Sequence, residues 1–160
     1  MHDIVPLTPD LWPAFEALFG KQGACYGCWC TYFRLPPAAR RQSSGERNKD
    51  HIRSRIAGGP PPGLLAIRGG EADGWMQIGP RHDVPEWNNK GRASAPLDGA
   101  DAADPAVWAI SCFFVRIKAR GQGLTRQLVA AGIDHARRNG ARLVEACPID
   151  FSRDTRSLSL

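Results

Sequence analysis

The sequence has no apolar run that approaches the roughly 20 residues of a membrane-spanning helix. The beginning of the chain does not resemble an export signal, because Asp3, Pro6, Pro9 and Asp10 interrupt its apolar residues. The number of cysteines is odd. Five cysteines in a chain that shows no export signal indicate reduced thiols rather than a disulfide framework. These absences argue against a membrane protein or a secreted protein, and we expect a cytoplasmic one.

The charge pattern lacks the basic stripe with interleaved aromatic residues that is typical of nucleic-acid-binding proteins. Lysine and arginine together number 21 against 16 acidic residues, and the resulting net charge of +5 suits an anionic partner. The basic residues are scattered, with one local concentration at Arg116, Lys118, Arg120 and Arg126. The arginines at 40–55 are typical of a solvated helix face, so we expect no nucleic acid as partner.

The 160 residues, 42% of them hydrophobic, suit one compact domain, which we expect at 1–150, followed by a polar tail at 151–160. Apolar periodicity predicts strands at 2–7, 64–68, 74–79, 107–115 and 142–147, and helices at 10–19, 36–57 and from Leu124 to a C-cap signal at Gly140. Residues 80–105 show no sustained period, which predicts a mobile or functional loop. The residues of the last helix that we expect to face the core are Leu124, Leu128, Val129, Ile133 and Ala136.

The most informative segment joins the apolar strand at 107–115 to the last helix. It is basic and contains Gly121 and Gly123, which allow successive backbone amides to turn toward one point. The following helix adds its unpaired N-terminal donors, so the segment predicts a cradle for an anion such as a diphosphate. The spacing does not match the glycine patterns of the P-loop or of the dinucleotide-binding fold. The alternative interpretation is an ordinary tight turn that needs glycine for its geometry.

The segment Arg120-Gly121-Gln122-Gly123-Leu124-Thr125 resembles the acyl-CoA loop of the GNAT superfamily of N-acyltransferases, although Thr125 replaces a small last residue. The resemblance covers about residues 1–150 and includes these further segments: Cys28-Trp29-Cys30, Gly74 to Arg81, Cys112 to Val115, His135 to Arg137, and Gly140 to Arg142. It implies an α/β (α+β) fold in which helices flank a mixed, mostly antiparallel sheet that is splayed at the strand before the loop. It also implies that acetyl-CoA is the cosubstrate, held by Phe114, Val115, Arg120, Gly121, Gln122, Gly123, Leu124 and Thr125.

The function that the resemblance implies is an N-acetyltransferase. A primary amine of a small-molecule or peptide acceptor would attack the thioester directly, and no metal is needed. A domain of this family ordinarily continues with one more helix and two strands, which this chain is expected to lack. An alternative is therefore a catalytically impaired remnant that binds CoA or associates with a second copy as a homodimer.

The indications for the remaining site residues are weaker. Glu145, on the strand after the last helix, is a candidate general base, with a solvated or ion-paired strand acid as the alternative. A zinc site built on Cys25, Cys28 and Cys30 is a third hypothesis, against reduced cysteines that pack with Trp29. The candidates for the acceptor pocket, with core packing as the alternative, are Trp29, Phe33, Trp75 and Gln77.

Overall fold

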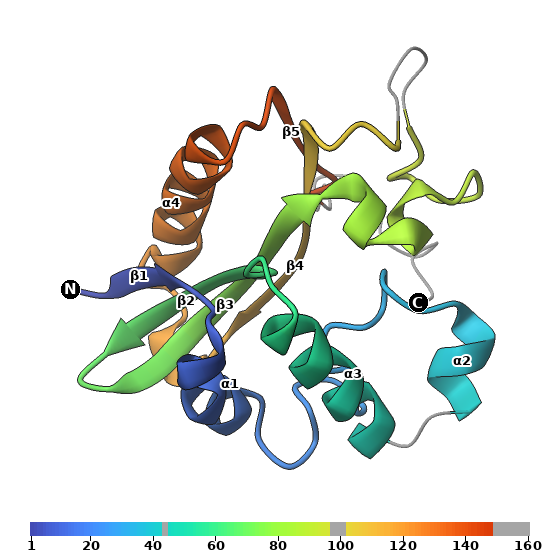
Figure 1. The fold of residues 1–160 in the computed structure, drawn as a ribbon. Helices are drawn as coiled ribbons and strands as arrows, with labels where there is room; N and C mark the ends of the chain where they lie inside the picture. The colour runs from blue at the N-terminus through green and yellow to red at the C-terminus, as the bar shows by residue number, and fades with distance from the viewer. Residues whose placement is uncertain (43–44, 97–101, 149–160) are drawn as a thin grey trace.

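A computed structural model describes residues 1–42, 45–96 and 102–148 of the chain. In these residues five strands form one sheet in the order β1-β2-β3-β4-β5 (Figure 1). The strands from β1 to β4 pair antiparallel, whereas β5 pairs parallel with β4. The mixed, mostly antiparallel sheet expected from the sequence is confirmed. The bounds are β1 Asp3–Pro6, β2 Gly63–Arg68, β3 Glu71–Pro80, β4 Val107–Val115 and β5 Leu143–Ala146.

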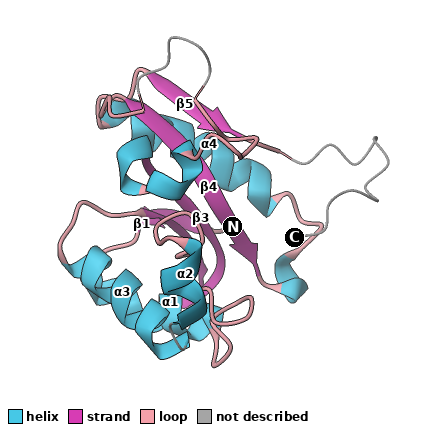
Figure 2. Ribbon diagram, turned by 90° about the vertical axis from the view of Figure 1, so that its right-hand side faces the viewer, coloured by secondary structure: helices cyan, strands magenta, loops and turns pink. Residues whose placement is uncertain are grey.

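Helices cover both faces of the sheet. The short 3-10 helix η1 (Pro9–Leu11), α1 (Trp12–Phe19) and α3 (Gly45–Ala57) lie on one side, and α4 (Leu124–Arg138) lies on the other (Figure 1). Figure 2 shows α1, α3 and the short helix α2 (Pro37–Gln42) grouped on the side of the molecule away from β5. None of the helices among the described residues has both the length and the apolar character needed to cross a membrane.

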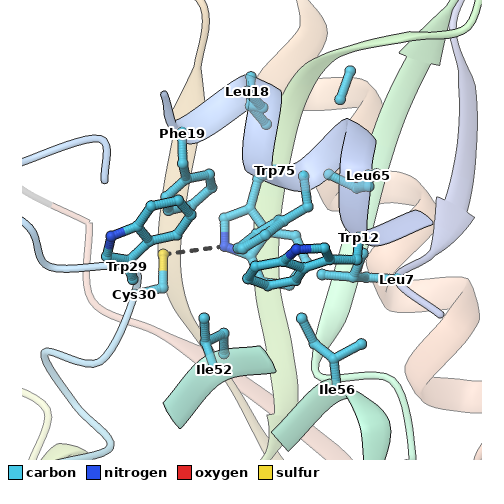
Figure 3. Close-up of a cluster of buried hydrophobic side chains, with 12 residues drawn as sticks. Leu7, Trp12, Leu18, Phe19, Trp29, Cys30, Ile52, Ile56, Leu65 and Trp75 are labelled. Atoms are coloured by element: carbon cyan, nitrogen blue, oxygen red, sulfur yellow. Dashed lines mark hydrogen bonds between the residues drawn. The ribbon is translucent and has the colours of Figure 1, made fainter. Parts of the chain in front are cut away.

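The core has an aromatic half between α1, α3 and the sheet (Figure 3). The side chain of Trp75 on β3 is fully buried there, with its ring edge against Phe15 of α1 at a centroid distance of 5.1 Å. On the opposite face α4 lies close to the sheet, and a β-carbon added at Gly132 would stand 2.2 Å from Cε of Met76. Only glycine therefore fits this close approach of helix and sheet without displacing a core side chain.

Two predictions about helices were wrong in detail. The stretch 36–57 is not one helix but two, α2 and α3, and residues 43 and 44 between them lie outside the described residues. Ile133 does not face the core, because its side chain is 41% exposed. The buried positions of α4 are Leu124, Leu128, Gly132 and Ala136, spaced by four residues, and Ile133 stands about 100° around the helix from that row.

The segment expected as one long irregular loop contains local structure. Two 3-10 helices, η2 (Arg81–Asp83) and η3 (Pro85–Asn88), follow β3 directly, and the side chains of Arg81 and Trp87 are buried. The polar tail expected at 151–160 lies outside the described residues.

Candidate functional site

The glycine-containing segment turns the chain from the end of β4 to the start of α4. The 3-10 helix η4 (Ile117–Ala119) follows β4, and Gly123 is the N-cap of α4. Gly121 and Gly123 have φ angles of 74° and 73°, in the left-handed region that disfavours any residue with a β-carbon. The first turn of a helix leaves its backbone N–H groups without intrahelical acceptors, so the start of α4 supplies free donors at this turn.

A cavity of about 240 Å³ opens at the same turn. Arg120 and Arg126 are the charged residues in its lining, which makes the cavity electropositive. Six of the eight predicted cofactor-binding residues line it together with Ala119 and Arg126: Val115, Arg120, Gly121, Gly123, Leu124 and Thr125. Two larger cavities, of about 400 and 550 Å³, lie at α1, and Arg116 contributes to the lining of the larger one.

The other two predicted residues have different surroundings. The side-chain amide of Gln122 donates to the backbone oxygen of Lys118 at 2.9 Å and so braces the turn. The ring of Phe114 faces α1, where it packs against Phe19 at a centroid distance of 5.3 Å.

The four basic residues that are close together in the sequence after β4 form two groups with different partners. Arg120 stands at the cavity, where its Nε donates to the oxygen of Val115 at 3.0 Å. Arg116 and Lys118 are instead paired with Glu71 on β3, at 3.4 and 3.3 Å. The positive charge at the cavity therefore comes from Arg120 and Arg126 rather than from all four residues.

Strand β4 has an open edge next to this cavity. Strand β5 pairs only with Val107–Ile110, and in the described part of the chain no strand pairs with Ser111–Val115 on that edge. The other edge pairs with β3, with a shift of register between Gln77 and Ile78, opposite Ser111. Such a bulge bends a strand, and bulges are common beside active sites. The splayed sheet that the sequence resemblance implies stays a prediction.

A buried polar network lies behind the bulge. Gln77 donates from its amide nitrogen to Ser111 Oγ at 2.8 Å and accepts from Nε of Arg34 at 3.1 Å. Arg34 forms an ion pair with Asp83 at 2.9 Å, and Asp83 also accepts from Arg55. Burial alone would raise the pKa of Asp83, but the hydrogen bond from Arg55 and the charge of Arg34 outweigh burial and hold that pKa below its usual value.

Sequence reasoning missed Arg34 and Ser111 as members of this network. Arg34 follows two aromatic residues in a segment without clear period, and its charge in such a segment was the available signal. Its partners come from positions far along the chain, and spacing does not reveal them.

Glu145 lies on β5, and its carboxylate is paired with the guanidinium of Arg81. Arg81 is 1% exposed and also donates to Asn88 Oδ1 and to the backbone oxygen of Ser94, both at 2.8 Å. This arrangement agrees with the interpretation of Glu145 as an ion-paired strand acid. Its role as a general base stays a prediction.

The residues suggested for the acceptor pocket lie mostly in the interior. Trp75 and Gln77 are 0% and 1% exposed, and Trp29 is 4% exposed and stacks on Phe19. This burial agrees with the packing interpretation of these three, and their place in an acceptor pocket stays a prediction. Phe33 is half-buried beside Trp87 and keeps some accessible surface.

The three clustered cysteines do not converge. Cys25 is exposed, Cys28 is half-buried and Cys30 is buried, and no three ligand side chains that could hold a metal ion come together within the described residues. The sulfur of Cys30 lies instead 2.9 Å from that of Cys112 on β4 and accepts the indole N–H of Trp75 at 3.2 Å (Figure 3).

Comparison with known proteins agrees with the resemblance seen in the sequence. A family model described as the acetyltransferase (GNAT) family matches residues 26–158. No curated protein matches the chain in a sequence comparison.

Solved structures of N-acetyltransferases share the fold. AAC(6')-Iy in complex with the bisubstrate analogue CoA-S-monomethyl-acetylneamine superposes with a TM-score of 0.57, at 18% identity over 94% of this chain and 82% of that one. A ribosomal-protein-alanine N-acetyltransferase from Brucella melitensis biovar Abortus 2308 superposes with a TM-score of 0.51, at 14% identity over 99% of this chain and 87% of that one. The YhbS protein of Escherichia coli, in complex with CoA, has a TM-score of 0.51 and 23% identity over 91% of this chain and 61% of that one.

Proposed function

The chain belongs to the acetyltransferase (GNAT) family, and from that premise we propose that it transfers an acetyl group from acetyl-CoA to a primary amine. The observation that carries the proposal is the turn between β4 and α4, where two left-handed glycines and the start of a helix line an electropositive cavity. A helix N-terminus combined with turned backbone amides is a general device for binding phosphate groups.

The residues at the turn fit the diphosphate of acetyl-CoA. A β-carbon placed at Gly121 or Gly123 would have no other atom within 4 Å, so the space beside these two α-carbons is open. Arg120 and Arg126 add charge at the rim. Each charge-assisted hydrogen bond formed there contributes about 1.5–3 kcal/mol.

The open edge of β4 fits the extended arm of the same cosubstrate. Ser111–Val115 present backbone donors and acceptors that β5 leaves unpaired, and an extended ligand binds such an edge as an added strand does. The edge leads directly to the turn, so one continuous surface of this chain would hold both the arm and the diphosphate.

The chemistry of this family is direct attack of the amine on the thioester, which acetyl-CoA supplies. The amine must lose a proton before it attacks, and Glu145 remains the candidate to receive it. The acceptor is a small molecule or a peptide amine, and a cytoplasmic location belongs to the same proposal. The alternative is a protein that binds CoA without turnover, which the engagement of Glu145 by Arg81 favours.

Calorimetric titration of the full chain with acetyl-CoA and with CoA tests the binding step. We expect saturable heat with both ligands. The absence of heat at millimolar ligand, with a folded sample, would remove the proposal.

Turnover is tested with a panel of small and peptide amines, and the CoA produced is quantified by chromatography because the five thiols of the chain would react with a colorimetric thiol reagent. We expect acetylated amine and CoA in equal amounts for at least one acceptor. Binding of acetyl-CoA without product across the panel would favour the alternative.

Glu145→Gln tests the base, because glutamine keeps the shape and a hydrogen bond to Arg81 but cannot take a proton. The change also removes the charge partner of the buried Arg81 and destabilises the chain, so the kinetics are measured on samples shown to be folded by urea unfolding. We expect kcat to fall about 10²–10⁴-fold with an unchanged Kd for acetyl-CoA. An unchanged kcat would show that Glu145 is not the base and serves only in the ion pair with Arg81.

A further inference from the structure

Two cysteines that are far apart in the sequence meet in the structure, and the proposed function uses the side chain of neither. Cys30 lies in the segment after α1 and Cys112 lies on β4, with 2.9 Å between their sulfur atoms. Cys30 is 4% exposed, whereas Cys112 is half-buried. No disulfide joins any of the five cysteines, which all lie within the described residues.

Two irregular features of the backbone bring these sulfur atoms together. Trp29 and Cys30 have φ angles of 47° and 55°, a left-handed conformation that costs a residue other than glycine about 1–2 kcal/mol. On β4, Ile110 packs on the α4 side of the sheet, but after the bulge at Ser111 it is Cys112 that packs on the α1 side. In an uninterrupted strand both would share one face. The strained backbone at Cys30 and the bulge before Cys112 therefore both help to bring the two sulfur atoms into contact.

The surroundings give the two thiols different properties. The indole N–H of Trp75 donates to the sulfur of Cys30, and a hydrogen bond joins the sulfur atoms of Cys30 and Cys112. This hydrogen bond, helped by the charge of Arg34, lowers the pKa of the Cys112 thiol against the effect of burial. Burial raises the pKa of Cys30. Cys112 is therefore the more nucleophilic thiol and the more exposed residue of the two, and Cys30 is held beside it as a protonated thiol.

We propose that Cys30 and Cys112 form a redox-sensitive pair that a hydroperoxide oxidises to an intramolecular disulfide. The Cys112 thiolate attacks the hydroperoxide, whose O–O bond breaks. Cys112 becomes a sulfenic acid, and the departing alkoxide takes a proton to give an alcohol. The sulfur of Cys30 then attacks the sulfur of Cys112, and hydroxide leaves as water with the proton of Cys30. The two thiols lose two electrons and the hydroperoxide gains two.

The reaction needs little movement. A disulfide has its sulfur atoms about 2.05 Å apart, so the two sulfurs must approach by about 0.9 Å. Rotation of a side chain provides a shift of this size without a change of the sheet. The product would link the segment after α1 covalently to the central part of β4.

The experiment treats the reduced full chain with equimolar hydrogen peroxide, denatures it and alkylates the remaining thiols with N-ethylmaleimide. We expect three labelled cysteines instead of five, and five again after dithiothreitol. Chymotrypsin cleaves after Tyr26 and Trp29 and so separates Cys25, Cys28 and Cys30, which lets mass spectrometry assign the link. The expected link joins the peptides of Cys30 and Cys112.

Two variants complete the test. In Cys30→Ser we expect a sulfenic acid at Cys112, which dimedone traps, and no internal disulfide. Cys147→Ser is the matched control, because Cys147 is exposed and its sulfur contacts the backbone oxygen of Ala93 rather than either member of the pair, and its oxidised form should still carry the link. Five labelled cysteines in oxidised wild-type protein, or a link between any other two cysteines, would overturn the proposal. If Cys30→Ser does not fold, the peptide map of the wild-type protein alone shows whether Cys30 and Cys112 are linked. This result does not depend on whether the chain transfers acetyl groups.

Discussion

Replacing Gly121 by alanine tests whether the turn before α4 binds the cosubstrate through its backbone. Gly121 has a φ angle of 74° and no atom near the place of a β-carbon, so the added methyl group meets no protein atom. The substitution acts by making the left-handed conformation unfavourable, at a cost of about 1–2 kcal/mol. If the loop relaxes and one amide turns away, acetyl-CoA loses one charge-assisted hydrogen bond, about 1.5–3 kcal/mol. The Kd should then rise roughly 10–150-fold.

Gly70 provides the matched control. It lies between β2 and β3, has a φ angle of 83° and likewise has no atom within 4 Å of the place that a β-carbon would take. Gly70→Ala and Gly121→Ala should therefore lower the melting temperature by similar amounts, roughly 2–8 °C. Only Gly121→Ala should weaken acetyl-CoA binding in calorimetric titration. Equal affinities in the two variants, with both proteins folded, would refute the assignment of the diphosphate to this turn.

Other predictions concern charge and packing. Arg126→Ala should raise the Kd for acetyl-CoA about 3–10-fold and make it less sensitive to salt, as measured by titration at two ionic strengths. The pKa of Asp83 is lowered in the folded chain, so its stabilising effect is present above its unfolded pKa of about 3.9 and is lost as the pH falls through the lower folded value. Asp83→Asn should destabilise at pH 7 by about 3–5 kcal/mol, because Arg34 is left buried without its charge partner, and urea unfolding should show a smaller loss of stability toward pH 3 than in wild type. Leu128→Ala should cost about 2–5 kcal/mol in the same assay, whereas Ile133→Ala should cost about 0.5 kcal/mol. Similar costs at the two positions would contradict the orientation of α4.

Local patterns in the sequence predicted the elements that depend on their own apolar residues or on neighbouring segments. The apolar run Val107–Val115 forms β4 with those same bounds. The predicted hairpin is present as β2 and β3, but its turn is shorter than expected, so β3 begins at Glu71 rather than at Gly74. The turn at Gly121 was also predictable, because glycines between a strand and an amphipathic helix serve a local geometric need.

Features that depend on distant partners were not predictable in this way. The bulge at Ser111 leaves no mark in a continuous apolar run, yet it decides that Cys112 and Ile110 face opposite sides of the sheet. The contact between Cys30 and Cys112 joins positions 82 residues apart. Arg81 looked like a loop residue because its three acceptors lie on separate segments.

The buried guanidinium of Arg81 couples the unfolding of three separate segments. It contacts η3, the backbone at Ser94 and the four-residue strand β5. If any of these segments detached, the buried guanidinium would lose one of its hydrogen-bond or charge partners. Segments that share one desolvated charge come apart as a single cooperative unit rather than one by one. The short outer strand and the irregular chain after β3 therefore belong to one subglobal unfolding event, although 50 residues of sequence separate Ala95 from Glu145.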